Sequence, residues 1–291
     1  MISQLIQFIF SGITTGSTYA LAALGFTIIY NASGVINFAQ GEFIMLGGMS
    51  AVFLADAGVA LPFAIILAVG ITGLAGMVLE KLAIEPAKDA EVVTLIIITI
   101  GASLTIRGLV QVWLGKGSHA LAAFSGDTPI AFFGASLMPQ SLWVIGVMLL
   151  VVMLLSWFFG RTLLGKAMLA TSHNKLAAQL VGINTRMILL LSFGMSAVLG
   201  ALGGILIAPM TYTSYDVGIM FGLKGFVAAV LGGLGGGAGA IFGGLILGIA
   251  EALTAGYVSS AYKDAVPFIL ILLILFFKPS GLFGSYVSER V

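Results

Sequence analysis

The residues best suited to chemistry lie in one short polar stretch, Asn31–Gly48, between two long apolar runs. The stretch contains four closely spaced candidate residues, Asn37, Gln40, Gly41 and Glu42, and Glu42 is the first charged residue of the chain. If the flanking runs lie in lipid, irregular backbone is tolerated only where protein buries it or where it lines a wet cavity. An ionisable side chain at the bilayer centre costs roughly 2.5–3.5 kcal/mol on insertion scales. The stretch therefore predicts either an element of a solute pathway or an ordinary cytoplasmic turn in which Glu42 favours the start of a helix.

Glycines interrupt a second stretch, Gly222–Gly256. Four of them join the predicted solute pathway: Gly232, Gly233, Gly235 and Gly236. The spacing Gly233-x-Gly235-x-x-Ala238 matches a dinucleotide-binding fingerprint, but that motif needs a preceding strand of a parallel sheet, which this composition does not offer. A broken membrane helix explains the glycines better, because they allow close backbone approach and unusual dihedral angles. Interrupted segments in both halves of a chain are typical of a transporter built as an inverted repeat, so we expect the two breaks to face each other, with Asn37 and Glu42 as polar groups.

Two further charged residues interrupt apolar runs, Arg107 and Glu251. Arg107 can extend its side chain to the interface, pair with a carboxylate or line a polar path. An intramembrane enzyme is disfavoured: the chain has no cysteine, its only histidines, His119 and His173, fall in predicted loops, and no nucleophile–base pair or metal cluster is evident. No Gly-x-x-x-x-Gly-Lys-Ser/Thr sequence occurs, so we expect ATP hydrolysis, if any is required, to take place in another chain.

The composition places these residues in an all-α polytopic membrane protein. Of the 291 residues, 60% are hydrophobic and 8% charged, whereas soluble domains average about 25% charged residues. A net charge of +1 gives no indication of nucleic-acid binding. Apolar segments of about 20 residues predict helical spans in a single transmembrane domain over residues 1–291. We expect about eight full spans and the glycine-rich broken helix. Six spans cover Leu5–Tyr30, Glu42–Phe53, Pro62–Leu82, Val92–Leu114, Ser141–Phe159 and Met187–Ala208. The seventh is the longer part of Gly222–Gly256, and the last begins at Val266.

The loop Arg161–Arg186 carries four basic residues and no acidic one. The positive-inside rule assigns it to the cytoplasm, which puts the N-terminus outside and the C-terminus inside. Within it, apolar residues at helical spacing, including Ala177 and Leu180, are typical of a helix that docks into a groove of a partner. Small residues such as Ala170 and Gly182 would allow close contact, and we expect one helix over Leu169–Ile183. A plain positive-inside loop explains the charges equally well.

Several motifs together resemble one known family. They are Gly16-Ser17-x-Tyr19-Ala20-Leu21-x-Ala23-Leu24-Gly25-Phe26, Gly34-Val35-Ile36-Asn37-Phe38-Ala39-Gln40-Gly41-Glu42, Lys224-Gly225-Phe226-Val227-Ala228-Ala229-Val230-Leu231-Gly232-Gly233 and Pro279-x-Gly281-Leu282-Phe283-Gly284. In this order the chain resembles the LivH-type permease of branched-chain amino acid ABC importers over nearly its whole length. It departs from the family at Glu85-Pro86, where the family often has Arg before the proline, and at His173-Asn174, where the family usually has an acidic residue.

The resemblance implies a set of partners. These are a periplasmic solute-binding protein, a second related permease chain in a heterodimer, and two cytoplasmic ATPase subunits that bind ATP and Mg²⁺, with no cofactor in this chain. It implies a multi-pass protein of the bacterial inner membrane that is not itself an enzyme. The solutes that it implies are branched-chain or related amino acids, or else amides, urea or aromatic acids. The ATPase contact would fall on Ala170, His173, Asn174, Ala177, Leu180 and Gly182. The rival is a self-sufficient ion-coupled transporter that uses Glu42, Arg107 and Glu251; such a carrier has no need of the basic loop.

Overall fold

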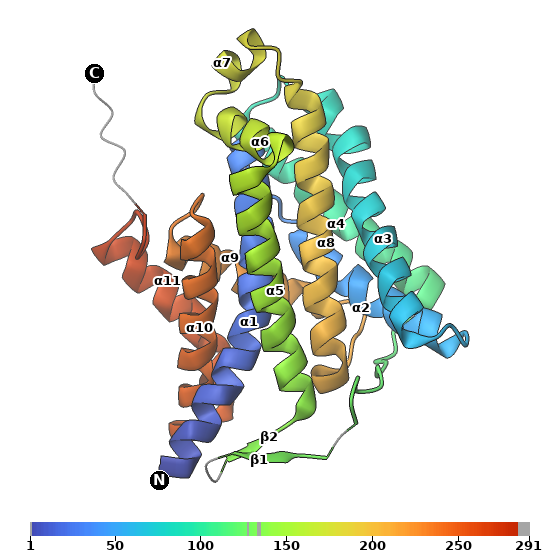
Figure 1. The fold of residues 1–291 in the computed structure, drawn as a ribbon, viewed down its shortest axis with the longest axis vertical. Coiled ribbons are helices and arrows are strands. Elements are labelled where there is room, and N and C mark those ends of the chain that lie inside the picture. Colours follow the sequence, from blue (N-terminus) through green and yellow to red (C-terminus); the bar gives the residue numbers. More distant parts are fainter. Residues whose placement is uncertain (1, 127, 133–134, 285–291) are drawn as a thin grey trace.

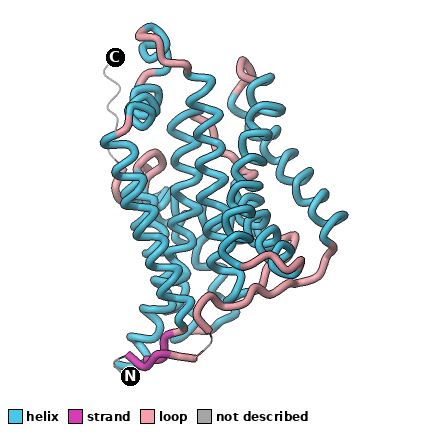
Figure 2. The backbone as a smooth tube through the Cα atoms, turned by 45° about the vertical axis from the view of Figure 1, so that its right-hand side comes forward, coloured by secondary structure: helices cyan, strands magenta, loops and turns pink. Residues whose placement is uncertain are grey.

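The computed structural model describes residues 2–126, 128–132 and 135–284, and most of them are helical (Figure 1). The elements in chain order are α1 Ile2–Ser33, α2 Gln40–Asp56, α3 Leu61–Leu79, a π turn at Glu80–Ile84 and a 3₁₀ turn at Glu85–Ala87, α4 Val92–Leu114, β1 Ile130–Phe132, β2 Ala135–Leu137, α5 Pro139–Arg161, α6 Leu163–His173, α7 Lys175–Leu180, α8 Thr185–Thr211, α9 Val217–Gly232, α10 Gly237–Tyr257, a 3₁₀ turn at Ser260–Ala265, and α11 Val266–Phe277. In the part of the chain that the structure describes, the strands are those of the antiparallel β1–β2 hairpin near the N-terminus (Figure 2).

Seven helical segments of the described chain are long and apolar enough to cross a membrane. This confirms the all-α polytopic class. The number is one below the eight predicted, because the segment predicted as the second span is the 17-residue helix α2. At 1.5 Å per residue, α2 and the 16-residue α9 are about 25 Å long, less than the ~30 Å of a bilayer core. The inverted repeat stays a prediction.

The core is built around α1, which packs on α8, α9 and α10. Its contact with α10 depends on glycine: a Cβ atom added to Gly16 would lie 2.8 Å from the carbonyl oxygen of Gly244, and one on Gly12 would lie 3.0 Å from that of Gly248. Small residues spaced along both helices thus bring the backbones into direct contact, as is common in membranes. Helices α4, α5 and α11 instead expose most of their apolar side chains.

The two ends of the bundle differ. The N-terminus and the β1–β2 hairpin lie at one end, and α6 and α7 lie at the other (Figure 1). Backbone hydrogen bonds of 2.8 Å in both directions join His119 to Thr213, so the segment after α4 and the segment after α8 are adjacent. The arrangement agrees with the predicted separation of the N-terminus from the basic loop; which end faces the cytoplasm stays a prediction.

Candidate functional site

Side chains accept hydrogen bonds from the backbone of the break between α1 and α2. Gly34 adopts φ +73°, which ends α1. The Asn37 Oδ1 atom accepts a hydrogen bond from the backbone N–H of Ala39 at 3.0 Å, and the Thr99 hydroxyl of α4 accepts one from Phe38 at 3.2 Å. Irregular backbone at membrane depth needs such partners, and α4 and the break provide them. The buried Nδ2 of Asn37 has no acceptor among the described residues.

Gln40 joins α2 to the core and does not face a cavity. Its Nε2 donates to the carbonyl oxygen of Ser196 at 3.1 Å, and the Ser196 hydroxyl lies 2.5 Å from its Oε1. The side chain is fully buried against Gly25 of α1. The sequence placed Gln40 in the solute pathway; the structure places it in a structural contact between α1, α2 and α8.

Glu42 forms a buried ion pair with Arg107 of α4. Nη2 and Nε of Arg107 donate to Glu42 Oε1 at 2.5 and 3.2 Å, and the Ser103 hydroxyl donates to the same oxygen at 2.8 Å. The Glu42 side chain is 2% exposed and that of Arg107 21%. Of the three roles open to Arg107 from the sequence, the structure shows pairing with a carboxylate.

This pair lies in a groove between α4 and α9, with a cavity of about 190 Å³. Gly41 forms part of its floor and packs closely on Gly218 and Gly222 of α9. The walls are mainly apolar: Phe26, Phe38, Ile100, Leu104, Ile219, Leu223 and Phe226. We call this the α4–α9 groove. It combines one charged pair with apolar walls, which suits a small solute that has a charged head and an apolar body.

The glycine-rich break forms a tight turn between α9 and α10. Gly233 and Gly235 adopt φ +102° and +94°, which only glycine does without strain. Gly232 and Gly233 pack under the segment after α11, whose Phe283 N–H donates to the Gly232 carbonyl at 3.1 Å, and Gly236 closes the turn by donating to Gly233 at 3.2 Å. These glycines pack backbone on backbone and do not line the α4–α9 groove.

The two breaks meet beside one cavity, which Asn31 and Gly235 both line. Asn31, at the end of α1, donates to the carbonyl oxygen of Gly235 at 2.9 Å. Glu42 instead contacts α4 and the start of α9, and Asn37 lies beside Leu95 and Thr99 of α4, so the expectation that these two side chains face the glycine turn is wrong. The physical reason is that α9 begins at Val217 and presents its first turns, not its last, to Glu42.

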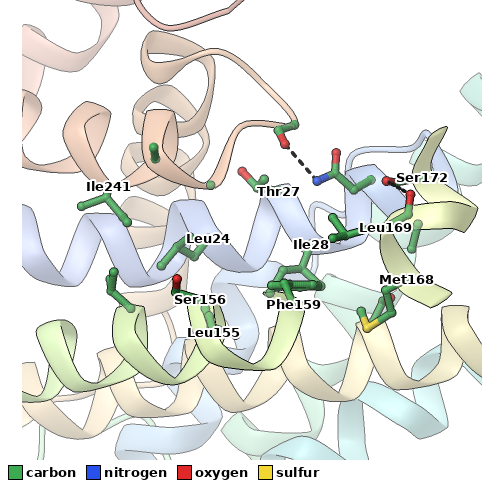
Figure 3. A pocket seen from close by; sticks show the side chains of 17 residues that line it. Leu24, Thr27, Ile28, Leu155, Ser156, Phe159, Met168, Leu169, Ser172 and Ile241 are labelled. Carbon is green, nitrogen blue, oxygen red and sulfur yellow. Dashed lines mark hydrogen bonds between the residues drawn. The ribbon is translucent and has the colours of Figure 1, made fainter. Parts of the chain in front are cut away.

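A separate cavity of about 360 Å³ lies beside the glycine turn (Figure 3). Helices α1, α5, α6 and α10 surround it; the side chains labelled in Figure 3 are Leu24, Thr27, Ile28, Leu155, Ser156, Phe159, Met168, Leu169, Ser172 and Ile241. The Thr27 hydroxyl is buried there without a partner among the described residues. Because α6 closes one side, this cavity connects the glycine turn with the basic segment.

A second charged cluster, which was not predicted from the sequence, joins α1, α9 and α10. Lys224 of α9 lies 3.0 Å from Glu251 of α10 and 2.7 Å from Asp264 of the following 3₁₀ turn. The Tyr19 hydroxyl of α1 donates to Glu251 at 2.7 Å. The signal was available: Lys224 and Glu251 are isolated charges of opposite sign in apolar runs, which predicts a pair when both runs lie in the membrane.

The basic segment forms two short helices where one was predicted. Asn174 is extended (φ −156°) between α6 and α7, and its Oδ1 accepts from the N–H of Ala177 at 2.9 Å as the N-cap of α7. Ala170, His173, Ala177 and Leu180 are exposed, and Gly182 follows α7 with φ +88°. Asn174 is therefore the residue that divides the predicted helix, because its side chain starts a new one.

Seven apolar helices, irregular breaks and ion pairs buried among them define a multi-pass membrane transport protein. Residues 8–275 match the family described as "Branched-chain amino acid transport system / permease component", and the chain belongs to this family.

Curated relatives agree with this assignment. The chain is 36% identical to the high-affinity branched-chain amino acid transport system permease protein LivH of Escherichia coli (strain K12), over 98% of this chain and 97% of LivH. It is 34% identical to the corresponding protein BraD of Pseudomonas aeruginosa, over 98% of both chains. The solved structure of PsaBC from Streptococcus pneumoniae in complex with Fab has a chain that matches with a TM-score of 0.56, 17% identity and coverage of 96% of this chain and 97% of that chain, and it shows the fold alone.

Proposed function

We propose that this chain is one transmembrane permease domain that passes branched-chain or related apolar amino acids across the bacterial inner membrane. It would act within an importer that receives the solute from a periplasmic binding protein and is driven by separate ATPase subunits. The names of LivH and BraD support the solute class, and the chain contains no P-loop sequence of its own. ATP and Mg²⁺ would therefore bind the ATPase subunits, with no cofactor in this chain.

The observation that carries the pathway is the charged pair in the α4–α9 groove. Gly41 and Glu42 remain pathway residues, and Arg107 joins them, since all three line this groove. Asn37 and the glycines Gly232, Gly233, Gly235 and Gly236 would act indirectly, by fixing the backbone around it. The groove is open on the side away from α1 and α2, and α4 exposes apolar residues there such as Ile100 and Leu104. A second permease chain would close it, as the resemblance implies.

The ATPase contact would lie on α6 and α7. Leu176, Leu180 and Val181 are 74%, 89% and 77% exposed, although they are large and apolar and lie at one end of the bundle (Figure 1). Exposed apolar patches rimmed by charge are typical of sites that bind another protein, and Lys175 and Arg186 flank this one. The residues proposed for the contact are Ala170, His173, Asn174, Ala177, Leu180 and Gly182.

The rival ion-coupled carrier has less support. A proton- or cation-coupled site needs a carboxylate that can exchange its cation, and Glu42 and Glu251 are each paired with a basic side chain at 2.5 and 3.0 Å. A lone carrier also has no use for the exposed apolar patch on α7.

Co-purification tests the ATPase contact. Ala177→Trp adds bulk to the exposed face of α7, and overpacking of this kind costs roughly 1–3 kcal/mol of contact energy, so we expect the ATPase subunits to be lost from the solubilised complex. Ala131→Trp, at an exposed position of the hairpin at the opposite end of the bundle, is the control and should retain them. In proteoliposomes, uptake of leucine that depends on both ATP and the binding protein is the expected activity. Uptake that persists without ATP and follows an ion gradient would establish the rival.

A further inference from the structure

The guanidinium of Arg107 has hydrogen-bonding capacity that the chain does not use. An arginine carries five N–H donors. Three are engaged: Nε and Nη2 donate to Glu42 Oε1, and Nη2 also donates to the Ser103 hydroxyl at 3.3 Å. Over the part of the chain that the structure describes, no residue accepts a hydrogen bond from Nη1. Two donors of a charged group are therefore left for another partner.

The position of Arg107 limits what that partner is. The residue lies in α4, inside a helix that is apolar and long enough to span the membrane, and it lines the α4–α9 groove. Charged groups at such depth line solute or ion paths and pair with one another. Glu42 holds the Nε–Nη2 edge of the guanidinium, so its orientation is fixed before any ligand arrives.

A carboxylate fits the free donors better than other polar groups do. Both free donors are on Nη1, and with a carboxylate they form charge-assisted hydrogen bonds, which are roughly twice as strong as those with a neutral acceptor. Next to it, Leu104, Ile219 and Phe226 offer apolar surface for the rest of a solute. The cavity of about 190 Å³ is below the ~300–1,000 Å³ of drug-sized sites, which limits the occupant to one small molecule.

We propose that Nη1 of Arg107 binds the carboxylate of the solute during passage, so that the permease itself selects small apolar molecules that carry a carboxylate. Glu42 is the positioning residue: it orients the guanidinium and neutralises most of its charge. The remaining attraction for a carboxylate is weak, which suits a pathway that must also release its solute. The inference rests on the proposed function, and among the solutes that the sequence left open it favours amino acids and aromatic acids over amides and urea.

Cysteine protection tests this selectivity without relying on the binding protein, which selects solutes itself. Because the chain has no cysteine, Leu104→Cys introduces a single thiol in α4, three residues before Arg107 and lining the groove. N-ethylmaleimide modification is followed in the purified complex with tens of millimolar leucine, 4-methylpentanoate, leucinamide or 3-methylbutylamine. We expect leucine and 4-methylpentanoate, which carry a carboxylate, to slow modification severalfold, and the amide and the amine to leave its rate unchanged.

Charge variants complete the test. Arg107→Gln should remove the protection, whereas Arg161→Gln, the same substitution at an exposed position at the end of α5, should keep it. If Arg107→Gln does not fold, the double variant Glu42→Gln/Arg107→Gln removes both buried charges and should likewise give no protection. Three results would each overturn the proposal. The acid and the amine could protect the thiol equally, or the protection could survive without Arg107. The third result is no protection by any compound in a complex that takes up leucine. A complex that shows carboxylate protection but no ATP-dependent uptake would refute the proposed function alone.

Discussion

Removing one member of the Glu42–Arg107 pair should destabilise the protein far more than removing both. Breaking a buried ion pair costs about 3–5 kcal/mol, because it leaves one charge uncompensated. In Arg107→Gln that charge is the Glu42 carboxylate, which is 2% exposed and keeps only the Ser103 hydroxyl. In Glu42→Gln the remaining guanidinium is 21% exposed and can turn toward the groove, so we expect a smaller cost of about 1–3 kcal/mol. The double variant leaves two neutral amides that can hydrogen-bond to each other.

The assay is a double-mutant cycle on the free energy of unfolding in mixed micelles. We expect a coupling energy near the upper end of the ~0.5–3 kcal/mol found for residues in contact. The matched cycle uses Lys81 and Glu85, whose ion pair has side chains 63% and 22% exposed; exposed pairs at this helical spacing are worth about 0.3–0.5 kcal/mol. A coupling energy at Glu42–Arg107 no larger than that of the surface pair would refute the view that burial makes the two charges depend on each other.

Three further predictions concern packing, the second cluster and topology. A Cβ atom on Gly204 would overlap a backbone carbonyl of α2, so Gly204→Ala should cost roughly 1–3 kcal/mol, whereas Gly146→Ala, where nothing lies within 4 Å, should be neutral or slightly stabilising by thermal unfolding. Tyr19→Phe removes a hydrogen bond to a buried carboxylate and should cost about 1.5–3 kcal/mol by the same measurement. In intact cells an impermeant thiol reagent should label a cysteine placed at Ser3 but reach one at Leu176 only after permeabilisation; the reverse pattern would overturn the predicted orientation.

The fold class followed from the sequence because it depends on average properties. Runs of apolar residues set the spans, and helices α3, α4, α5 and α8 all begin within two residues of the segments predicted for them. Basic residues and small residues likewise indicated the exposed segment around Lys175. These features depend on residues close together in the sequence, so one sequence is enough to predict the helices from them.

Side-chain partners were harder to predict because they depend on how distant helices are rotated. Glu42 is 65 positions from Arg107, and Tyr19 is 232 from Glu251. Hydrophobic periodicity does not fix these rotations, since lipid-facing and core-facing surfaces are equally apolar in a membrane protein. For the same reason Gln40, a polar residue in the break, was predicted to line the pathway although its amide is used within the core.

The start of α9 explains why the charged pair lies where it does. Glu42 is in the first turn of α2. Its second carboxylate oxygen has no hydrogen-bond partner among the described residues and lies beside Gly218 in the first turn of α9. Each helix start carries a partial positive charge on its free N–H groups, so two such ends stabilise one carboxylate. Both helices are shorter than a bilayer core is thick, and the first turn of α2 is buried inside the protein, next to the groove. The start of α9 at Val217 was not predicted, because the glycine-interrupted stretch was predicted to begin at Gly222.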